Sequence, residues 1–148
     1  MNITIEAVRD VTPEVVEAVG RLLPQLSSSA RPADPAALRR IAGWQGSRLY
    51  VARADGEVAG MLTLIEFPIP TGLRAWIEDV VVDEAARGNG IGAALTRAAV
   101  RQARADGART VDLTSRPSRR AANRLYERLG FRARDSRVYR LPADADVR

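Results

Sequence analysis

A strand, a glycine-rich turn and a helix follow one another at residues 80–92, and this segment limits the possible folds most. It reads Val80-Val81-Val82-Asp83-Glu84-Ala85-Ala86-Arg87-Gly88-Asn89-Gly90-Ile91-Gly92. The consecutive valines predict a central strand that is buried on both faces. The glycines allow positive φ angles and the close approach of a ligand to the backbone. Because a helix N-terminus presents free N–H groups and a partial positive charge, the segment predicts a phosphate or pyrophosphate site.

Two common phosphate-binding motifs do not fit this turn. A P-loop needs Gly-Lys-Ser/Thr after its glycines, and the chain contains no Lys. A dinucleotide fingerprint needs Gly or Ala at its sixth position, and counting from Gly90 that position is Leu95. Asp112 lies where a ribose-binding acid would follow, but the antiparallel hairpins predicted ahead of the turn argue against a dinucleotide fold.

The size and composition predict one soluble domain. At 148 residues and 46% hydrophobic content, the chain is expected to form a single domain over residues 1–148, with residues 142–148 frayed. It has no apolar run of about 18 residues, which a membrane-spanning helix needs. Charged residues near the N-terminus, such as Glu6 and Arg9, argue against a signal peptide. A cytoplasmic location is therefore expected.

The residue types that are missing exclude several chemistries. The chain has no Cys and no His, so disulfides, Cys/His zinc sites, Cys nucleophiles and Ser-His-Asp triads are impossible. No metal site is expected. All 23 basic residues are Arg, and the net charge is +5. The arginines are spread along the chain without interleaved aromatic residues, which argues against nucleic-acid binding as the main activity.

Periodicity and turn residues predict the order β-α-α-β-β-β-α-β-α-β. This order corresponds to an α/β (α+β) fold with a mixed, mostly antiparallel central sheet flanked by helices. The predicted strands are residues 2–9, 49–52, 58–67, 73–82 and 110–114, with one or two more in 131–141. The predicted helices begin at Thr12-Pro13 (ending at Leu23 before Pro24), at Asp34-Pro35 (to about Trp44), at Asn89 (to about Asp106), and at Ser118 as N-cap (through Leu129).

A second motif lies in the last predicted helix, at Asn123-Arg124-Leu125-Tyr126-Glu127-Arg128-Leu129-Gly130-Phe131. Asn123 and Tyr126 are spaced to share one helix face. With the turn at residues 87–92, this segment resembles the GNAT family of N-acetyltransferases. The turn matches the family's R/Q-x-x-G-x-G/A motif for acetyl-coenzyme A, and the helix matches N-x-x-L-Y-x-x-x-G-F. The resemblance is strong over residues 73–131, and elsewhere it is limited to the order of the elements.

The resemblance implies a fold with a splayed pair of strands that holds coenzyme A, and it implies acetyl-CoA as the acetyl donor. The strand backbone would bind the pantetheine arm and the thioester carbonyl, and the turn amides would bind the pyrophosphate. The donor-binding residues that it implies are Val80, Val81, Val82, Arg87, Gly88, Asn89, Gly90, Ile91, Gly92 and Asn123.

The same resemblance assigns catalytic roles to two side chains. Tyr126 occupies the family's general-acid position, where a phenol protonates the leaving thiolate. Glu78 is favoured as the base or the anchor for the acceptor amine, with Asp79 or water as the alternatives. The implied activity is transfer of an acetyl group to a primary amine by direct attack in a ternary complex.

Several alternatives stay open at this stage. A non-catalytic acyl-CoA sensor on the same fold is one, and an Arg-rich interaction or nucleic-acid-binding module is another. The acceptor is expected to be a small-molecule amine or a protein amino group, and no membrane or nucleic-acid partner is expected. The protein is expected to be a monomer or a homodimer.

Overall fold

The computed structural model describes residues 1–148 and contains the predicted elements up to the last helix, in the predicted order. The strands are β1 (Ile3–Ala7), β2 (Ser47–Ala54), β3 (Glu57–Ile69), β4 (Gly72–Val82) and β5 (Thr110–Asp112). The helices are α1 (Pro13–Leu26), α2 (Pro35–Gly43), α3 (Ile91–Ala105) and α4 (Arg120–Arg128), and the short 3-10 helix η1 (Glu84–Ala86) precedes α3. No helix is both long and apolar enough to cross a membrane.

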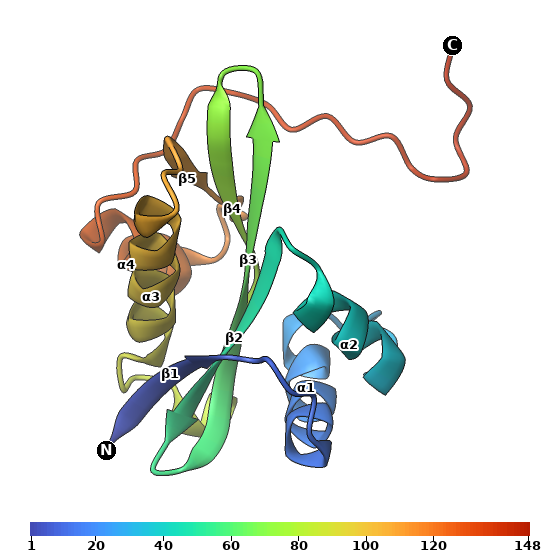
Figure 1. Cartoon of the computed structure of the whole chain (residues 1–148). Helices are drawn as coiled ribbons and strands as arrows, with labels where there is room; N and C mark the ends of the chain where they lie inside the picture. Colours follow the sequence, from blue (N-terminus) through green and yellow to red (C-terminus); the bar gives the residue numbers. More distant parts are fainter.

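The strands form one five-stranded sheet in the order β1-β2-β3-β4-β5 (Figure 1). The neighbours from β1 to β4 pair antiparallel, and β4 pairs with β5 in parallel. The predicted turn at Asp55-Gly56 connects β2 and β3, and both residues have positive φ (50° and 90°). Two-residue hairpin turns require positive φ at both central residues, and an Asp-Gly pair adopts it readily. The hairpin predicted at this pair is therefore confirmed.

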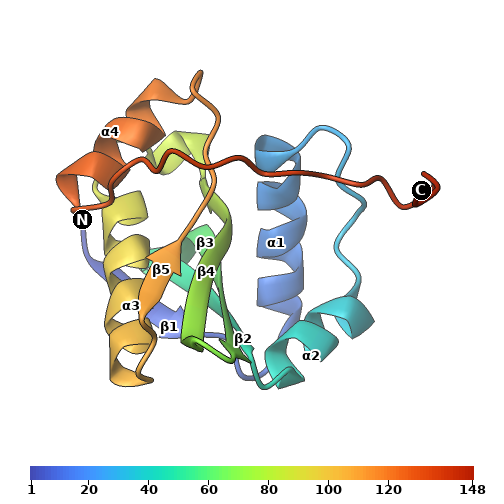
Figure 2. The ribbon, with the colours of Figure 1, turned by 90° about the horizontal axis from the view of Figure 1, so that it is seen from above.

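Helices cover both faces of the sheet and create two hydrophobic cores. Helices α1 and α2 lie on one side, and α3 and α4 lie on the other (Figure 2). On the α3 side, Ile91 and Leu95 pack with Leu62, Leu64 and other strand residues. On the α1 side, helix residues such as Val19 and Leu22 pack with a second set of strand residues. Strands β3 and β4 thus contribute side chains to both cores.

The caps of the first two helices are those that the sequence predicts. The Thr12 hydroxyl accepts a hydrogen bond from the Val15 N–H (3.3 Å), and the Asp34 carboxylate accepts one from the Ala36 N–H (3.0 Å). Helix α1, however, does not end before Pro24 but continues to Leu26. Pro24 lies in the last turn, where it removes one backbone donor, and the Ser27 N–H closes the helix on the Leu23 carbonyl (2.9 Å).

Two predictions for the C-terminal part are wrong. Ser118 does not cap α4, because the N-cap residue is Arg119 and no side chain caps this helix. The Ser118 carbonyl accepts a hydrogen bond from the Arg120 N–H (3.0 Å). The segment 131–141 forms no strand, and residues 132–148 run away from the sheet without regular structure (Figure 1). Strand β5 (Thr110–Asp112) pairs with β4 alone, so it is an edge strand of the sheet.

Candidate functional site at the end of strand β4

Strands β4 and β5 separate after a short paired stretch. The parallel ladder joins Arg74 to Thr110, Ala75 to Val111 and Trp76 to Asp112, and it ends there because β5 ends at Asp112. An ion pair between Arg74 and Asp112 (2.7 Å) holds the paired part together. Strand β4 continues to Val82 with a ladder partner on the β3 side only. Its last residues therefore present an open edge, where an extended ligand can hydrogen-bond to the backbone.

A β-bulge lies within this open part of β4. Glu78 is opposite Thr63 and Val81 is opposite Met61, so Asp79 and Val80 share one partner on β3. Asp79 has a φ of 52°, in the left-handed region that non-glycine residues seldom adopt. Val81 consequently belongs to the core on the α1 side, whereas Val80 and Val82 pack against the core on the α3 side. The predicted valine strand is confirmed, but the bulge was not predicted.

The predicted turn follows β4 directly. Gly88 and Gly90 have φ angles of 83° and 80°, and apart from their own and the adjacent residues no atom lies within 4 Å of where their Cβ atoms would be. The Asn89 side chain donates a hydrogen bond to the Ala86 carbonyl (3.0 Å), and Arg87 Nε donates one to the Val82 carbonyl (3.2 Å). The backbone of the turn is thus held in shape by two of the predicted residues, and open space remains beside its glycines.

The N-terminus of α3 leaves a row of backbone donors free. The N–H groups of residues 88 to 93 donate no backbone hydrogen bond within the protein, and the N-cap Gly90 provides no side-chain acceptor. Consecutive free N–H groups at the positive end of a helix are suited to bind an anion such as a phosphate group. Ile91 is buried, so the start of α3 is anchored in the core.

Helix α4 packs beside this turn. A Cβ atom on Gly92 would lie 3.2 Å from a Leu125 methyl group and 3.7 Å from a Val82 methyl group, so the bare glycine lets α4, α3 and β4 meet. Tyr126 is buried and packs edge-to-face on Phe131, with ring centroids 5.8 Å apart. Burial raises the pKa of the Tyr126 phenol above its ordinary value, and the positive charge of Arg119 opposes this. The phenol therefore keeps its proton at neutral pH.

Asn123 and Glu78, the other predicted site residues, both form side-chain hydrogen bonds within the protein. The Asn123 side chain donates a hydrogen bond to the Arg116 carbonyl (3.1 Å) and thereby holds the loop before α4. Glu78 is exposed and accepts a hydrogen bond from Trp76 Nε1 (2.8 Å). Since Ala75 and Ile77 point into the core on the α3 side, Trp76 and Glu78 lie on the α1 face of β4. Glu78 and Tyr126 thus belong to opposite sides of the sheet.

The sequence did not identify several residues that surround the site. The Ser115 hydroxyl, in the loop after β5, is buried and has no hydrogen-bond partner. Such an atom fits a site that provides its partner from a ligand. The sequence could have indicated that Trp76 is a neighbour of Glu78, because residues two positions apart on a strand share one face. Nothing in the sequence around Ser115 distinguishes it from an ordinary loop serine.

Helix α1 is also tied to the segment before the turn. Arg21 forms an ion pair with Asp83 and donates a hydrogen bond to the Val58 carbonyl (3.0 Å). The Gln25 side chain accepts a hydrogen bond from the Glu84 N–H (2.9 Å). These contacts join residues far apart in the chain, and no local pattern around either partner predicts them. They fix η1, and with it the start of the turn, against α1.

Known proteins resemble this chain in sequence and in fold. A model of the acetyltransferase (GNAT) family matches residues 17–131. No curated protein matches the sequence at a significant level.

Solved structures with the same fold cover almost the whole chain. A transcriptional regulator from Bacillus halodurans C-125 is 30% identical, with a TM-score of 0.82 and coverage of 95% of this chain and 99% of that one. An acetyltransferase of Trypanosoma brucei is 27% identical, with a TM-score of 0.76 and coverage of 95% and 99%. AAC(6′)-Iy, solved with the bisubstrate analogue CoA-S-monomethyl-acetylneamine, is 17% identical, with a TM-score of 0.80 and coverage of 96% and 99%.

Proposed function

Because the chain belongs to the acetyltransferase (GNAT) family, we propose that it transfers an acetyl group from acetyl-CoA to a primary amine. The observation that carries this proposal is the row of free N–H groups at residues 88 to 93, next to the open edge of β4. The free N–H groups can hold a pyrophosphate, and the open edge of β4 can pair with an extended arm that carries amide groups. Coenzyme A contains both groups in one molecule.

The donor-binding residues follow from this placement. The N–H groups of Gly88 to Gly92 bind the pyrophosphate, whereas the Arg87 N–H, which the resemblance also implies, donates to the Glu84 carbonyl (3.4 Å) and is not free. The backbone of Val80 to Val82 pairs with the pantetheine and the thioester carbonyl. Asn123 approaches the same arm from α4. The partnerless Ser115 hydroxyl and the open space beside Gly88 and Gly90 support a ligand in this region.

The proposed chemistry is direct attack of the amine on the thioester carbon. A new C–N bond forms, the C–S bond breaks, and the sulfur leaves as a thiolate that takes the proton of the Tyr126 phenol. The chain has no Cys, so no acyl-cysteine intermediate precedes this step. The raised pKa of Tyr126 keeps the proton available until the thiolate forms. Glu78 accepts the proton of the amine directly or through water, with Asp79 as the alternative base.

The acceptor is proposed to be a primary amine on a small molecule or a protein. Glu78 and Asp79 are exposed carboxylates next to the open edge, and they attract an ammonium group before it loses its proton. The analogue bound to AAC(6′)-Iy joins coenzyme A to an aminoglycoside-like amine, so this fold can hold both groups at once.

The test measures thiol release from acetyl-CoA across a panel of primary amines. A thiol reagent reads the reaction cleanly because the protein itself has no thiol. We expect amine-dependent release, and we expect Tyr126→Phe to reduce kcat by about a hundredfold while the Kd for CoA stays unchanged. Tyr139→Phe is the matched control, because Tyr139 is 87% exposed. Equal turnover in Tyr126→Phe and wild type would disprove the general-acid role.

A non-catalytic sensor of acyl-CoA is the second candidate, favoured by the structural likeness to a transcriptional regulator. Calorimetry with CoA separates the two functions. CoA binding without turnover of any amine supports the sensor, and the absence of CoA binding contradicts both functions.

A further inference from the structure

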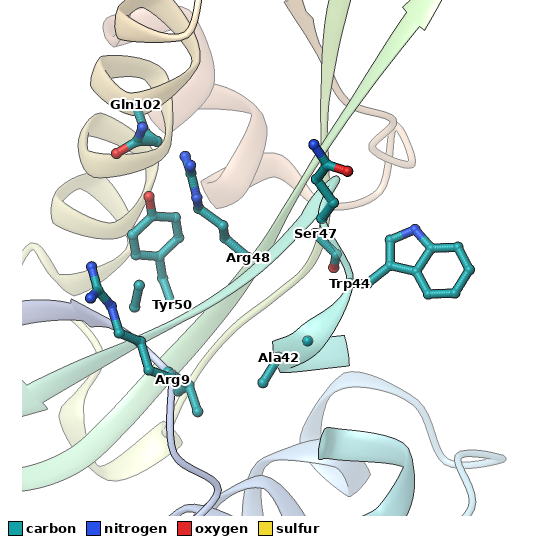
Figure 3. Close-up of a pocket in the computed structure, with 11 residues that line it drawn as sticks. Arg9, Ala42, Trp44, Ser47, Arg48, Tyr50 and Gln102 are labelled. Carbon is teal, nitrogen blue, oxygen red and sulfur yellow. The ribbon is translucent and has the colours of Figure 1, made fainter. Parts of the chain in front are cut away.

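A cavity of about 520 Å³ lies at the other end of α3 from the turn. Its walls come from the residues at the end of β1, from the α2–β2 connection with the first part of β2, and from Gln102 on α3 (Figure 3). Gln102 is roughly 16 Å along α3 from Ile91, at a rise of about 1.5 Å per residue. The cavity is therefore separate from the proposed donor site, and its volume falls in the range typical of sites for small molecules.

The cavity is lined by positive charge only. Arg9 and Arg48 are its charged residues, and no carboxylate lines it. Arg9 takes part in none of the ion pairs of the structure. An unpaired guanidinium beside a cavity without acidic groups attracts an anion.

The Arg48 side chain is held in place by two carboxylates that do not line the cavity. Its Nη1 contacts Asp106 at 2.8 Å and Glu66 at 3.5 Å, so its Nε and Nη2 donors have no carboxylate partner. Burial raises the pKa of Glu66 to about 7, and the neighbouring Asp106 acts in the same direction. Glu66 is thus partly protonated at neutral pH. Asp106, whose pKa is lowered by its hydrogen bond from Gln102, stays ionised and neutralises Arg48, so the net positive charge of the cavity comes from Arg9 and Arg48 contributes its free N–H donors.

Neutral hydrogen-bonding groups complete the wall. Figure 3 shows Arg9, Arg48, Tyr50 and Gln102 gathered on the same side of β2, whereas the Trp44 ring points away from them. Gln102 uses its amide NH₂ on Asp106 (3.0 Å), which keeps this side chain in position. The Tyr50 hydroxyl and the two guanidinium groups are donors that an oxyanion can satisfy together.

We propose that Arg9, Arg48, Tyr50 and Gln102 form a binding site for a small organic molecule that carries a carboxylate or a phosphate monoester. The guanidinium groups of Arg9 and Arg48 hold the oxyanion by bidentate hydrogen bonds, and Tyr50 donates a third. The cavity is much larger than a bare ion, so the organic part of the ligand fills the remainder. This site is independent of the proposed acetyl transfer.

Calorimetry on the full chain at low salt tests the proposal with four probes. Phenyl phosphate and benzoate represent the two oxyanions, inorganic phosphate represents the bare ion, and benzyl alcohol is the neutral control. We expect at least one aromatic anion to bind more tightly than inorganic phosphate, and benzyl alcohol not to bind. The titration is repeated with excess CoA present. Binding that persists places the anion away from the turn, and binding that disappears contradicts the proposal.

Variants identify the pocket itself. Arg9→Gln is expected to weaken the Kd of the bound anion at least about tenfold, and Tyr50→Phe several-fold. Arg39→Gln is the matched control, because Arg39 is an exposed arginine on α2 that does not line the cavity. Circular dichroism confirms that each variant is folded. No binding of either aromatic anion at 10 mM (about 3 kcal/mol of binding free energy), or equal affinity in Arg9→Gln and Arg39→Gln, would overturn the proposal.

Discussion

Glu66 shows how a single side chain changes its chemistry when strands and helices bury it. It is almost enclosed, one of its carboxylate oxygens has no hydrogen-bond partner, and Arg48 and Asp106 are its charged neighbours. Its pKa rises from an ordinary 4.5 to about 7 because burial penalises the charged form. The folded chain therefore holds a proton at pH values where the unfolded chain has already lost it.

This shift predicts a stability that falls as the pH rises. Because the folded-state pKa of Glu66 is the higher one, the free energy of unfolding decreases between about pH 4.5 and pH 7. Glu66→Gln removes the titration, and we expect it to be more stable than wild type at pH 8 by on the order of 1 kcal/mol. Urea unfolding of both proteins at pH 5 and pH 8 measures this. The prediction is contradicted if the difference in the free energy of unfolding between the two proteins is the same at pH 5 and pH 8.

Trp76 is expected to position Glu78 in the proposed reaction. Its indole N–H donates a hydrogen bond to the Glu78 carboxylate (2.8 Å), and both side chains lie on the same face of β4. Trp76→Phe keeps a large ring but removes the donor. We expect kcat to fall about threefold to tenfold, with no change in the KM for acetyl-CoA. Trp44→Phe is the control, because Trp44, the C-cap residue of α2, is 71% exposed. Equal kcat in both variants excludes the positioning role.

At the scale of elements, side-chain contacts between α1 and the segment before α3 connect the two halves of the fold. Gln25 and Arg21 hold Glu84 and Asp83, and these residues lead directly into the glycine turn. None of the four residues touches the free N–H groups at residues 88 to 93. They can influence ligand binding only by fixing where the turn begins.

Gln25→Ala is expected to weaken this connection without removing any ligand contact. The Glu84 N–H loses its acceptor, and η1 is held less firmly. We expect the Kd for CoA to rise about twofold to fivefold, a cost comparable to that of one exposed hydrogen bond. Calorimetry with CoA measures the change, and Gln45→Ala, remote from the turn, is the control. If both variants bind CoA equally, α1 does not position the turn.

Local signals explain why the sequence predicted most elements correctly. Thr12-Pro13, Asp34-Pro35 and Asp55-Gly56 carry caps and turns whose chemistry acts within a few residues, and the structure contains all three. The resemblance identified the turn, and the structure shows the positive φ angles expected at Gly88 and Gly90. The roles of Tyr126, Glu78 and Asn123 stay predictions.

Contacts between distant residues explain what the sequence did not predict. Residues 131–141 are predicted to add one or two strands, but a strand needs a partner edge, and no ladder joins this segment to β5. The cluster of Arg48, Glu66 and Asp106 joins β2, β3 and the end of α3. No pattern within any one of these elements indicates it.

At the scale of the whole molecule, the hydrophobic cores end at Phe131. This residue packs against the core on the α3 side and against Tyr126, whereas Val138, Tyr139 and Leu141 are exposed. The free energy of folding therefore comes from the chain up to this point. The final residues add charge and length but bury no apolar surface.

Removal of residues 142–148 is accordingly expected to leave the protein as stable as before. All of these residues are exposed, and we expect Tm to change by less than about 2 °C. Phe131→Ala is the contrasting variant, and it is expected to cost about 1–3 kcal/mol because it leaves a gap beside Tyr126. Thermal unfolding followed by circular dichroism compares the two. A large loss of Tm after the deletion shows that the end of the chain packs on the domain.

The bulge at Asp79 and Val80 determines which core each later side chain of strand β4 enters. A strand of the same length without the bulge would alternate without interruption, and Val80, Val81 and Val82 would each face the opposite core. Deletion of Asp79 alone removes the extra residue and leaves Val81 opposite Met61 and Val82 opposite Gly60, so the three valines are expected to keep their faces. The strand is therefore expected to tolerate the loss of this residue better than the gain of another one, which would turn the valines toward the wrong cores.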